Sequence, residues 1–170
     1  MNVQEFYQHA LSQRGPDNWL LCQEHEPTYT MGVRTDPANI LVDPATVGAD
    51  LVRADRGGDV TFHGPGQLTA YPVLTLPGRG GGDKPDTVAY VRTVEQLVID
   101  TLADLGLPGA TRLDDYPGVW VAPEGERPRK IAAIGVRLVR NRTLHGVALN
   151  VHPDLSYFDH IVPCGIAEYG

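Results

Sequence analysis

Two apolar segments joined by a short polar turn place the strongest limit on how this chain folds. In residues 131–140, Ile134, Val136 and Leu138 alternate with other residues, Asn141-Arg142 follows, and residues 143–150 (TLHGVALN) return. Alternation with period two on both sides of a two-residue turn is typical of a β-hairpin. We therefore predict two long antiparallel strands near the C-terminal end.

Residues 86–106 contain the best-defined helical pattern. Apolar residues recur at helical spacing on one face, Asp86 is suited to the N-cap, and Gly106 is suited to the position after the last turn. The predicted face comprises Val88, Val91, Val98, Leu102 and Leu105. A capping box of Asn2 and Glu5 predicts another helix, which continues to about Arg14.

Most of the remaining chain is predicted as short strands and loops. The predicted strands are residues 19–24, 29–31, 51–53, 60–63, 68–76 and 118–122, while residues 36–50 and 77–85 are predicted as irregular. Pro72 points to an edge strand or a bulge. A long helix among hairpin-linked strands indicates an α+β fold rather than a parallel α/β sheet.

Length and composition favour a single domain that covers residues 1–170. The chain has 42% hydrophobic residues and no apolar run near the ~20 residues of a membrane span, and its N-terminus lacks a signal-peptide pattern. We expect a cytoplasmic protein that has no membrane partner. The net charge of −7 argues against nucleic-acid binding. Both cysteines are expected as free thiols, with Cys22 in the core.

Basic residues gather between positions 127 and 142. Of the 14 lysines and arginines, six lie there: Arg127, Arg129, Lys130, Arg137, Arg140 and Arg142. They form either a solvated hairpin surface or a docking patch for an acidic partner. Lys130 is one of only two lysines against twelve arginines. A desolvated lysine can lose its proton and an arginine cannot, so Lys130 is a candidate for proton transfer.

Residues 56–67 (RGGDVTFHGPGQ) are rich in glycine but match neither of the two nucleotide-binding glycine motifs. The lysine and hydroxyl residue of a P-loop are missing, and the spacing differs from G-x-G-x-x-G. Cys22 and His25 form a possible metal half-site, but no second half-site with suitable spacing follows. We therefore expect no metal.

Cys164 lies in IVPCGI, between Pro163 and Gly165. It is either a packed thiol in a turn or a nucleophile, and a nucleophile requires a base or cation that favours the thiolate. The candidate partners are Lys130, His63, His145, His152 and His160. For His63, His145 and His152, hydrogen bonding within the sheet is the expected role. The glycine-rich segment would then line the substrate channel.

Four motifs in order, RGGDVTFHGPGQLTAYPVLTL, RKIAAIGVR, LHGVALN and IVPCGI, resemble the lipoyl(octanoyl) transferases of lipoate synthesis. The resemblance implies the fold of the biotin and lipoate protein ligase catalytic domain, a mixed sheet with packed helices. It also implies transfer of an octanoyl group from acyl carrier protein to a lysine of a lipoyl domain, without a cofactor. The implied acceptors are lipoyl domains of 2-oxoacid dehydrogenases or the glycine cleavage H protein.

The resemblance assigns Cys164 as the acyl-thioester nucleophile and Lys130 as the residue that lowers the thiol pKa and carries the proton. It also implies substrate-binding residues in three segments: Arg56, Gly57, Gly58, Asp59, Val60, Thr61, Phe62 and His63; Ala133, Ile134 and Gly135; and Gly146, Val147 and Ala148. Glycines at 57, 58, 64, 135 and 146 are expected to leave room for the acyl chain.

Two other functions remain open from the sequence. An ATP-dependent lipoate or biotin ligase on the same fold needs no cysteine, so in such an enzyme the IVPCGI motif would have no catalytic role. A non-catalytic module would bind acyl carrier protein or lipoyl domains through the basic residues. Known chains of the resembling family continue well beyond the cysteine motif, so the expected domain is truncated at its C-terminal end.

Overall fold

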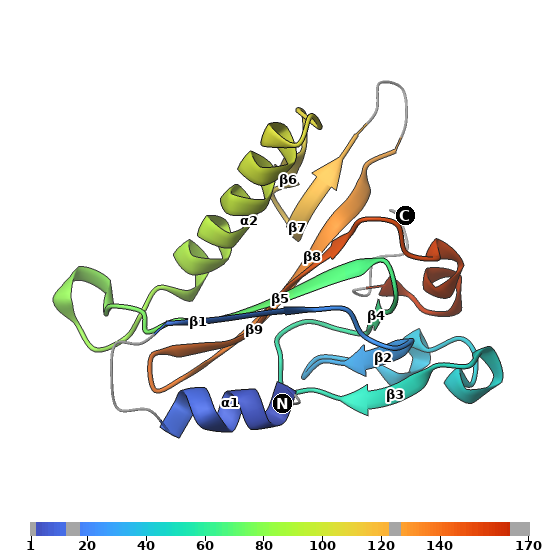
Figure 1. Cartoon of the computed structure of the whole chain (residues 1–170), viewed down its shortest axis with the longest axis horizontal. Helices are drawn as coiled ribbons and strands as arrows, with labels where there is room; N and C mark the ends of the chain where they lie inside the picture. The colour runs from blue at the N-terminus through green and yellow to red at the C-terminus, as the bar shows by residue number, and fades with distance from the viewer. Residues whose placement is uncertain (1–2, 13–17, 123–126, 164–170) are drawn as a thin grey trace.

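The computed structural model describes residues 3–12, 18–122 and 127–163. Its main element is a six-stranded sheet in which every neighbouring pair is antiparallel. In spatial order the strands are β1 (Trp19–Gln23), β5 (Gln67–Val73), β9 (Arg142–Asn150), β8 (Arg129–Val139), β7 (Tyr116–Val121) and β6 (Thr111–Leu113). The predicted hairpin, β8 and β9, lies at the centre of this sheet (Figure 1).

A second sheet has three strands in the order β3-β2-β4. These are β2 (Thr28–Met31), β3 (Asp50–Arg53) and β4 (Thr61–His63). The β2–β3 pair is parallel and the β2–β4 pair is antiparallel. Together with the antiparallel main sheet and two helices, this confirms the predicted α+β class.

The helices α1 (Val3–Ser12) and α2 (Thr87–Asp104) pack on opposite faces of the large sheet. In α2, Val98 and Leu102 pack against Val119 and Ala132. Phe6 and Ala10 of α1 pack instead against β5 and β9 residues of the other face, Tyr71, Val73 and Leu144. The second sheet lies on the same side as α1 (Figure 1). Four short 3-10 turns complete the described chain: η1 (Pro37–Asn39), η2 (Pro44–Val47), η3 (Arg79–Gly81) and η4 (Leu155–His160).

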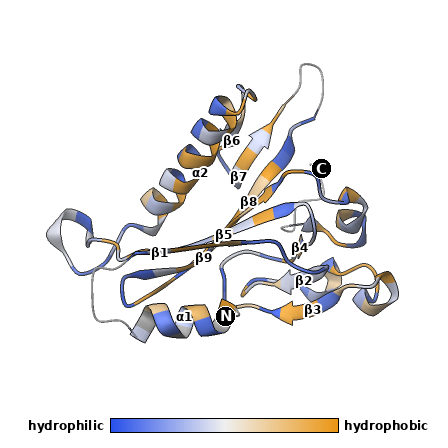
Figure 2. Ribbon diagram, in the orientation of Figure 1, coloured by the Kyte–Doolittle hydropathy of each residue, from blue (hydrophilic) through white to orange (hydrophobic). Residues whose placement is uncertain are grey.

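Helix α2 begins as predicted, and its buried face agrees with the predicted one at Val98 and Leu102 but not at its two ends. The Asp86 side chain accepts a hydrogen bond from the Ala89 backbone N–H at 3.0 Å, which confirms the N-cap. Val88 and Leu105, predicted to be buried, are 71% and 77% exposed. Polar and apolar residues are interleaved along the helix (Figure 2), and the buried face includes Glu95. The helix periodicity was correct, and the buried face shares Val98 and Leu102 with the predicted one but also includes Tyr90, Val94 and Glu95.

Three local predictions need correction. Cys22 is exposed on β1 rather than buried in the core, because β1 is the outermost strand of the sheet. The hairpin turn is formed by Arg140 and Asn141, which both have positive φ, with Val139 paired to Arg142. Strand β6 falls in a segment for which no strand was predicted. Among the described residues, no helix is long and apolar enough to cross a membrane.

Candidate active site

A cavity of about 650 Å³ lies between the two sheets. Its lining residues come from α1, the second sheet, the β3–β4 loop and the central strands β5, β8 and β9. The three segments expected to bind substrate meet there, through Arg56, Gly57, Gly58, Asp59, Thr61, His63, Ala133, Ile134, Gly135, Gly146, Val147 and Ala148. Register explains part of this convergence, because Gly135 pairs with Gly146 and Ala133 pairs with Ala148.

Val60 and Phe62, which we had expected at the substrate, belong to a different environment. They are 0% and 1% exposed and pack with Tyr29, Ala49 and Ile161 in a separate core. Alternation along β4 accounts for this placement, because neighbouring strand residues point to opposite faces. Thr61 and His63 face the cavity and Phe62 faces the core.

Arg56 is held in one orientation at the edge of the cavity. Its Nη2 donates to the Thr30 carbonyl oxygen at 2.6 Å and to Thr30 Oγ1 at 2.7 Å, and its Nη1 donates to the Gly57 carbonyl at 3.1 Å. Only 9% of the residue is exposed. These bonds fold the glycine loop over β2 and place a fixed positive charge beside the cavity.

Two histidines in the cavity are uncharged at neutral pH. Burial, the largest cause, lowers the pKa of His63 to about 4; the hydrogen bond to Gln67 opposes this shift and the positive charge of Arg56 adds to it. His63 Nδ1 lies 2.7 Å from Gln67 Oε1 and Nε2 lies 3.2 Å from Thr30 Oγ1. Burial also lowers the pKa of His25, whose Nε2 lies 2.6 Å from Tyr71 Oη. Both rings therefore act as neutral hydrogen-bonding groups.

His145 connects the cavity to a surface ion pair. It has a left-handed backbone at φ 58°, and its N–H donates to Tyr7 Oη at 2.8 Å. Its Nε2 lies 2.6 Å from Asp55 Oδ1, and the same carboxylate pairs with Arg137. Burial, followed by the charges of Arg56 and Arg137, lowers the pKa of His145, so the neutral ring can donate its Nε2–H to Asp55.

Four of the five glycines that are expected to leave room for the acyl chain, Gly57, Gly64, Gly135 and Gly146, lie close to protein atoms. A Cβ on Gly146 would lie 2.1 Å from the Ala70 carbonyl oxygen of β5. On Gly64 it would lie 2.5 Å from the Phe62 ring, and on Gly57 it would lie 3.2 Å from the Val136 carbonyl oxygen. A Cβ on Gly135 would meet the Arg56 side chain at 3.0 Å. At these positions a strand, a loop or a ring lies so close that a side chain would have little room, which explains why glycine is present.

Lys130, the candidate proton carrier, stands on β8 directly opposite Trp120 of β7. Its Nζ lies 4.7 Å from the centre of the Trp120 ring, and its backbone carbonyl accepts a hydrogen bond from Asn150 Nδ2 at 3.4 Å. Asn150 is linked through Gln67 to His63, so a polar chain runs from the cavity to the Lys130 backbone. Lys130 itself is not among the residues that line the cavity. Cys164 lies outside the described residues.

The basic segment does not form one surface patch. Arg142 is only 7% exposed, and Arg137 forms an ion pair with Asp55. Arg127, Arg129 and Arg140 are exposed. The exposed residues are also spread along the length of β8, since Arg127 precedes this strand and Arg140 follows it.

Several lining residues carried no clear signal in the sequence. Tyr7, His25, Thr30 and Tyr71 reach the cavity from separate elements, and Tyr7 is 138 positions from His145, whose backbone N–H it accepts. Alternation in β5 was the one available indication, since it groups Thr69 with Tyr71 on one face. Within the described ranges, no group of three or more histidine, cysteine, aspartate or glutamate side chains is arranged to hold a metal ion.

Known proteins resemble this chain in both sequence and fold. The model of the lipoyl protein ligase A/B catalytic domain matches residues 1–169. The octanoyltransferase of Thermobifida fusca is 47% identical over 170 residues, which covers 98% of this chain and 68% of that protein. The octanoyltransferase of Corynebacterium jeikeium is 49% identical over 161 residues, which covers 91% of this chain and 62% of that protein.

Solved structures support the fold alone. A bipartite lipoate protein ligase from Thermoplasma acidophilum superposes with a TM-score of 0.73 at 24% identity, covering 94% of this chain and 60% of that one. Lipoate-protein ligase A bound with ATP gives a TM-score of 0.67 at 21% identity, covering 99% of this chain and 71% of that one. Both bear out the expected ligase-like fold.

The chain spans between 58% and 68% of the length of the curated relatives compared with it. The family indicated by the four sequence motifs is confirmed by the domain match and by the identity to octanoyltransferases. This chain belongs to the lipoyl protein ligase A/B catalytic domain family.

Proposed function

We propose that this protein is an octanoyltransferase that uses Cys164 and Lys130. The observation that carries the proposal is the cavity between the sheets, where segments 56–63, 133–135 and 146–148 meet. Its volume of about 650 Å³ is in the range of small-molecule sites, which are typically about 300–1,000 Å³. Relatives named octanoyltransferase at 47–49% identity support the same activity.

The reaction proceeds in two acyl transfers. The Cys164 thiolate attacks the thioester carbonyl of octanoyl-acyl carrier protein, a new thioester forms, and the carrier leaves as a thiolate that takes a proton from the Lys130 ammonium group. The lysine amine of a lipoyl domain then attacks the acyl-enzyme, an amide forms, and Cys164 leaves as thiolate. As an ammonium cation, Lys130 stabilises the Cys164 thiolate before the first transfer. After it has given its proton to the carrier thiolate, the neutral Lys130 amine accepts the proton that the attacking amine loses.

The second transfer makes the cycle favourable, because an amide is more stable than a thioester. The first exchange, from one thioester to another, is close to thermoneutral. No ATP is therefore required at either step. Lipoyl domains of 2-oxoacid dehydrogenases and the glycine cleavage H protein are the proposed acceptors.

The cavity surfaces fit the acyl group by chemistry. Ala133, Ile134, Val147 and Ala148 offer apolar contacts to an alkyl chain, while Arg56, His63 and His25 offer polar contacts at the same cavity. Since burial keeps the two rings neutral, they add polar surface to the cavity without introducing further charge. An apolar lining with a few fixed polar groups is the common design of such sites.

Intact-mass measurement after incubation with octanoyl-acyl carrier protein tests the proposal. We expect one octanoyl adduct, absent in Cys164→Ala and retained in Cys22→Ala, whose exposed thiol is the matched control. Transfer to a lipoyl domain should proceed without ATP and Mg²⁺. An adduct on Cys22 would overturn the assignment of the nucleophile. A requirement for ATP would identify a ligase, and binding without any adduct would identify a non-catalytic module.

A further inference from the structure

Strand β8 contains an extra residue directly after Lys130. Val119 pairs with Ala132, but the next residue of β7, Trp120, pairs with Lys130 rather than with Ile131. Ile131 is therefore the additional residue of a β-bulge. Bulges of this kind change the direction in which the following side chains point.

The bulge decides which face of the sheet receives the Lys130 side chain. Ile131 and Ala132 both pack in the cluster that faces α2, although neighbours in a regular strand point to opposite faces. Without the extra residue, Lys130 would share a face with Ala132 and point at α2. With it, Lys130 lies on the face of Ala133 and Gly135, which line the cavity.

Gly118 lies at the other side of this bulge and in contact with the Lys130 stem. Its φ is 130°, in the region that favours glycine. A Cβ there would lie 2.6 Å from the Ala132 carbonyl oxygen and 3.3 Å from both Cδ and Cε of Lys130. The methylene chain of Lys130 therefore passes over Gly118 before its ammonium group reaches the Trp120 ring.

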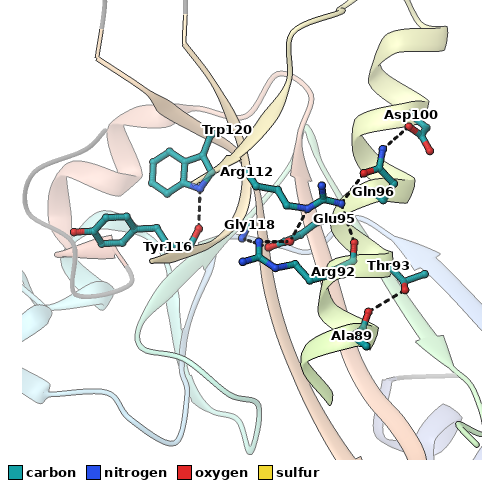
Figure 3. A network of polar contacts seen from close by, with 10 residues as sticks. All are labelled: Ala89, Arg92, Thr93, Glu95, Gln96, Asp100, Arg112, Tyr116, Gly118 and Trp120. Carbon is teal, nitrogen blue, oxygen red and sulfur yellow. Dashed lines mark hydrogen bonds and ion pairs between the residues drawn. The ribbon is translucent and has the colours of Figure 1, made fainter. Parts of the chain in front are cut away.

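Glu95 of α2 holds Gly118 from the opposite face of the sheet. The residue is 1% exposed, and its Oε1 accepts the backbone N–H of Gly118 at 3.0 Å. Its Oε2 accepts from Arg92 Nη1 and Arg112 Nε, each at 3.0 Å (Figure 3). Figure 3 shows the carboxylate between the helix and the strand that carries Trp120.

The surrounding groups make this carboxylate a rigid anchor. Arg112 Nη2 donates to the Arg92 carbonyl at 3.0 Å and to Gln96 Oε1 at 2.7 Å, so its guanidinium is fixed on α2. An ionised carboxylate forms hydrogen bonds roughly twice as strong as those of neutral groups. A buried charge would not serve packing alone, because an apolar residue at this position of the helix would do so without desolvation.

We propose that Glu95 is a positioning residue for Lys130. It fixes Gly118, Gly118 sets the bulge and supports the Lys130 stem, and Trp120 receives the ammonium group. The proposal rests on the function proposed above only in assigning Lys130 its proton-carrying role. The positioning itself is a property of the structure and can be measured without turnover.

Two measurements on the unmodified protein test the geometry. With labelled lysine, NMR should show the Lys130 ε-methylene signals displaced upfield by the Trp120 ring current, while those of Lys84, the other lysine, stay at ordinary values. Lys84→Arg assigns the two signals. The Gly118 amide should exchange slowly with solvent. An unshifted Lys130 signal or a fast-exchanging Gly118 amide would overturn the proposal.

Glu95→Gln tests the link between carboxylate and lysine. The amide can accept from Gly118 or from the arginines but not from both, so we expect the Lys130 signals to move toward those of Lys84. For octanoyl transfer, kcat should fall by about 10- to 100-fold, while KM for octanoyl-acyl carrier protein should change little. This is the pattern expected when a catalytic group is misplaced but substrate binding is intact. The alkaline limb of the pH profile should also shift.

Two controls separate positioning from stability. Asp100→Asn alters the exposed end of the same network, where Asp100 accepts from Gln96, and should leave Lys130 unchanged. Val98→Ala removes buried contacts of α2 and should lower stability without moving the Lys130 signals. Equal shifts of these signals in Val98→Ala and Glu95→Gln would reduce Glu95 to a purely structural role and overturn the proposal.

Failure of this proposal is distinguishable from failure of the proposed function. If Lys130→Ala retains full activity, the role of Lys130 in catalysis is wrong, whatever Glu95 does. If Lys130→Ala abolishes transfer while Glu95→Gln leaves both the Lys130 signals and kcat unchanged, the positioning proposal alone is wrong. If Glu95→Gln does not fold, the exchange rate of Gly118 in the unmodified protein still decides.

Discussion

The ammonium nitrogen of Lys130 lies 4.7 Å from the centre of the Trp120 ring, and these two residues face each other across β7 and β8. Trp120 is 1% exposed and donates its Nε1–H to the Tyr116 carbonyl at 3.0 Å. The ring is therefore held by its own hydrogen bond. A lysine placed over such a ring is attracted by its electron-rich face.

This arrangement leads to a prediction about the two tryptophans. Trp120→Phe removes the hydrogen bond to Tyr116 and part of the packing, so the free energy of unfolding should fall by about 2 kcal/mol. Trp19→Phe is the matched control, because no hydrogen-bond partner of the buried Trp19 Nε1 is found among the described residues. Trp19→Phe should lower the free energy of unfolding by clearly less than Trp120→Phe does. Urea denaturation of both variants measures the difference, and a larger loss for Trp19→Phe would contradict it.

The buried His63 predicts loss of stability in mild acid. Its pKa is about 4 in the folded protein, against about 6.5 for a free histidine. The unfolded state therefore binds more protons between these values, and the stabilisation present above pH 6.5 is lost as the pH falls toward 4. The full loss is about 3 kcal/mol.

Denaturation curves from pH 7 to pH 4 check this dependence. The slope of the unfolding free energy against pH gives the number of protons taken up on unfolding. In His63→Gln this number should be smaller by up to one. His152→Gln changes an exposed histidine and should leave the dependence as it was. Identical slopes in the unmodified protein and His63→Gln would mean that His63 is not buried in its neutral form.

Gly146→Ala should disrupt the pairing of β9 with β5. A Cβ at this position would lie 2.1 Å from the Ala70 carbonyl oxygen and 2.7 Å from Pro72 Cδ, so one strand has to move. We expect a loss of about 3 kcal/mol in the free energy of unfolding. Gly82→Ala is the control, since its nearest contact would be the Arg79 carbonyl oxygen at 3.3 Å in an exposed loop. Thermal melts of the two variants should differ strongly; similar melting temperatures would refute the steric argument.

Arg56→Lys should loosen the glycine loop. A lysine cannot reproduce the bonds that the two terminal nitrogens of Arg56 donate to Thr30 and Gly57, so about 2 kcal/mol of stability should be lost. The amide of Val33, which donates to the Arg56 carbonyl, should then exchange faster with solvent. Arg34→Lys, at an exposed neighbouring position, should have little effect. An unchanged Val33 exchange rate in Arg56→Lys would show that the loop is held by other contacts.

Local patterns in the sequence predicted the elements whose formation depends on nearby residues. Asp86 caps α2 because its side chain reaches an N–H three residues later, and the central hairpin forms because both strands alternate around an adjacent turn. The turn itself was displaced by one residue. Arg140 and Asn141 both adopt positive φ, and asparagine tolerates this conformation more readily than most residues.

The motifs also predicted which segments gather at the cavity, but not the role of each residue. Alternation in β4 sends Phe62 to the core and His63 to the cavity, and this direction depends on how the second sheet packs. Glu95 was passed over because a glutamate on a helix is ordinarily exposed. Its environment is formed by Arg112 and Gly118, which lie 17 and 23 positions away.

From its residues alone, the chain could be recognised as an α+β protein with a capped helix, a long hairpin and four motifs in family order, because such signals are carried by neighbours along the backbone. The direction of Lys130, the burial of Glu95 and the contact that requires a glycine at position 146 were set only when distant strands met. The physical reason is that periodicity assigns a side chain to one face of its own element. Burial and bonding depend on which other surface covers that face, and a single extra residue such as Ile131 reverses the assignment.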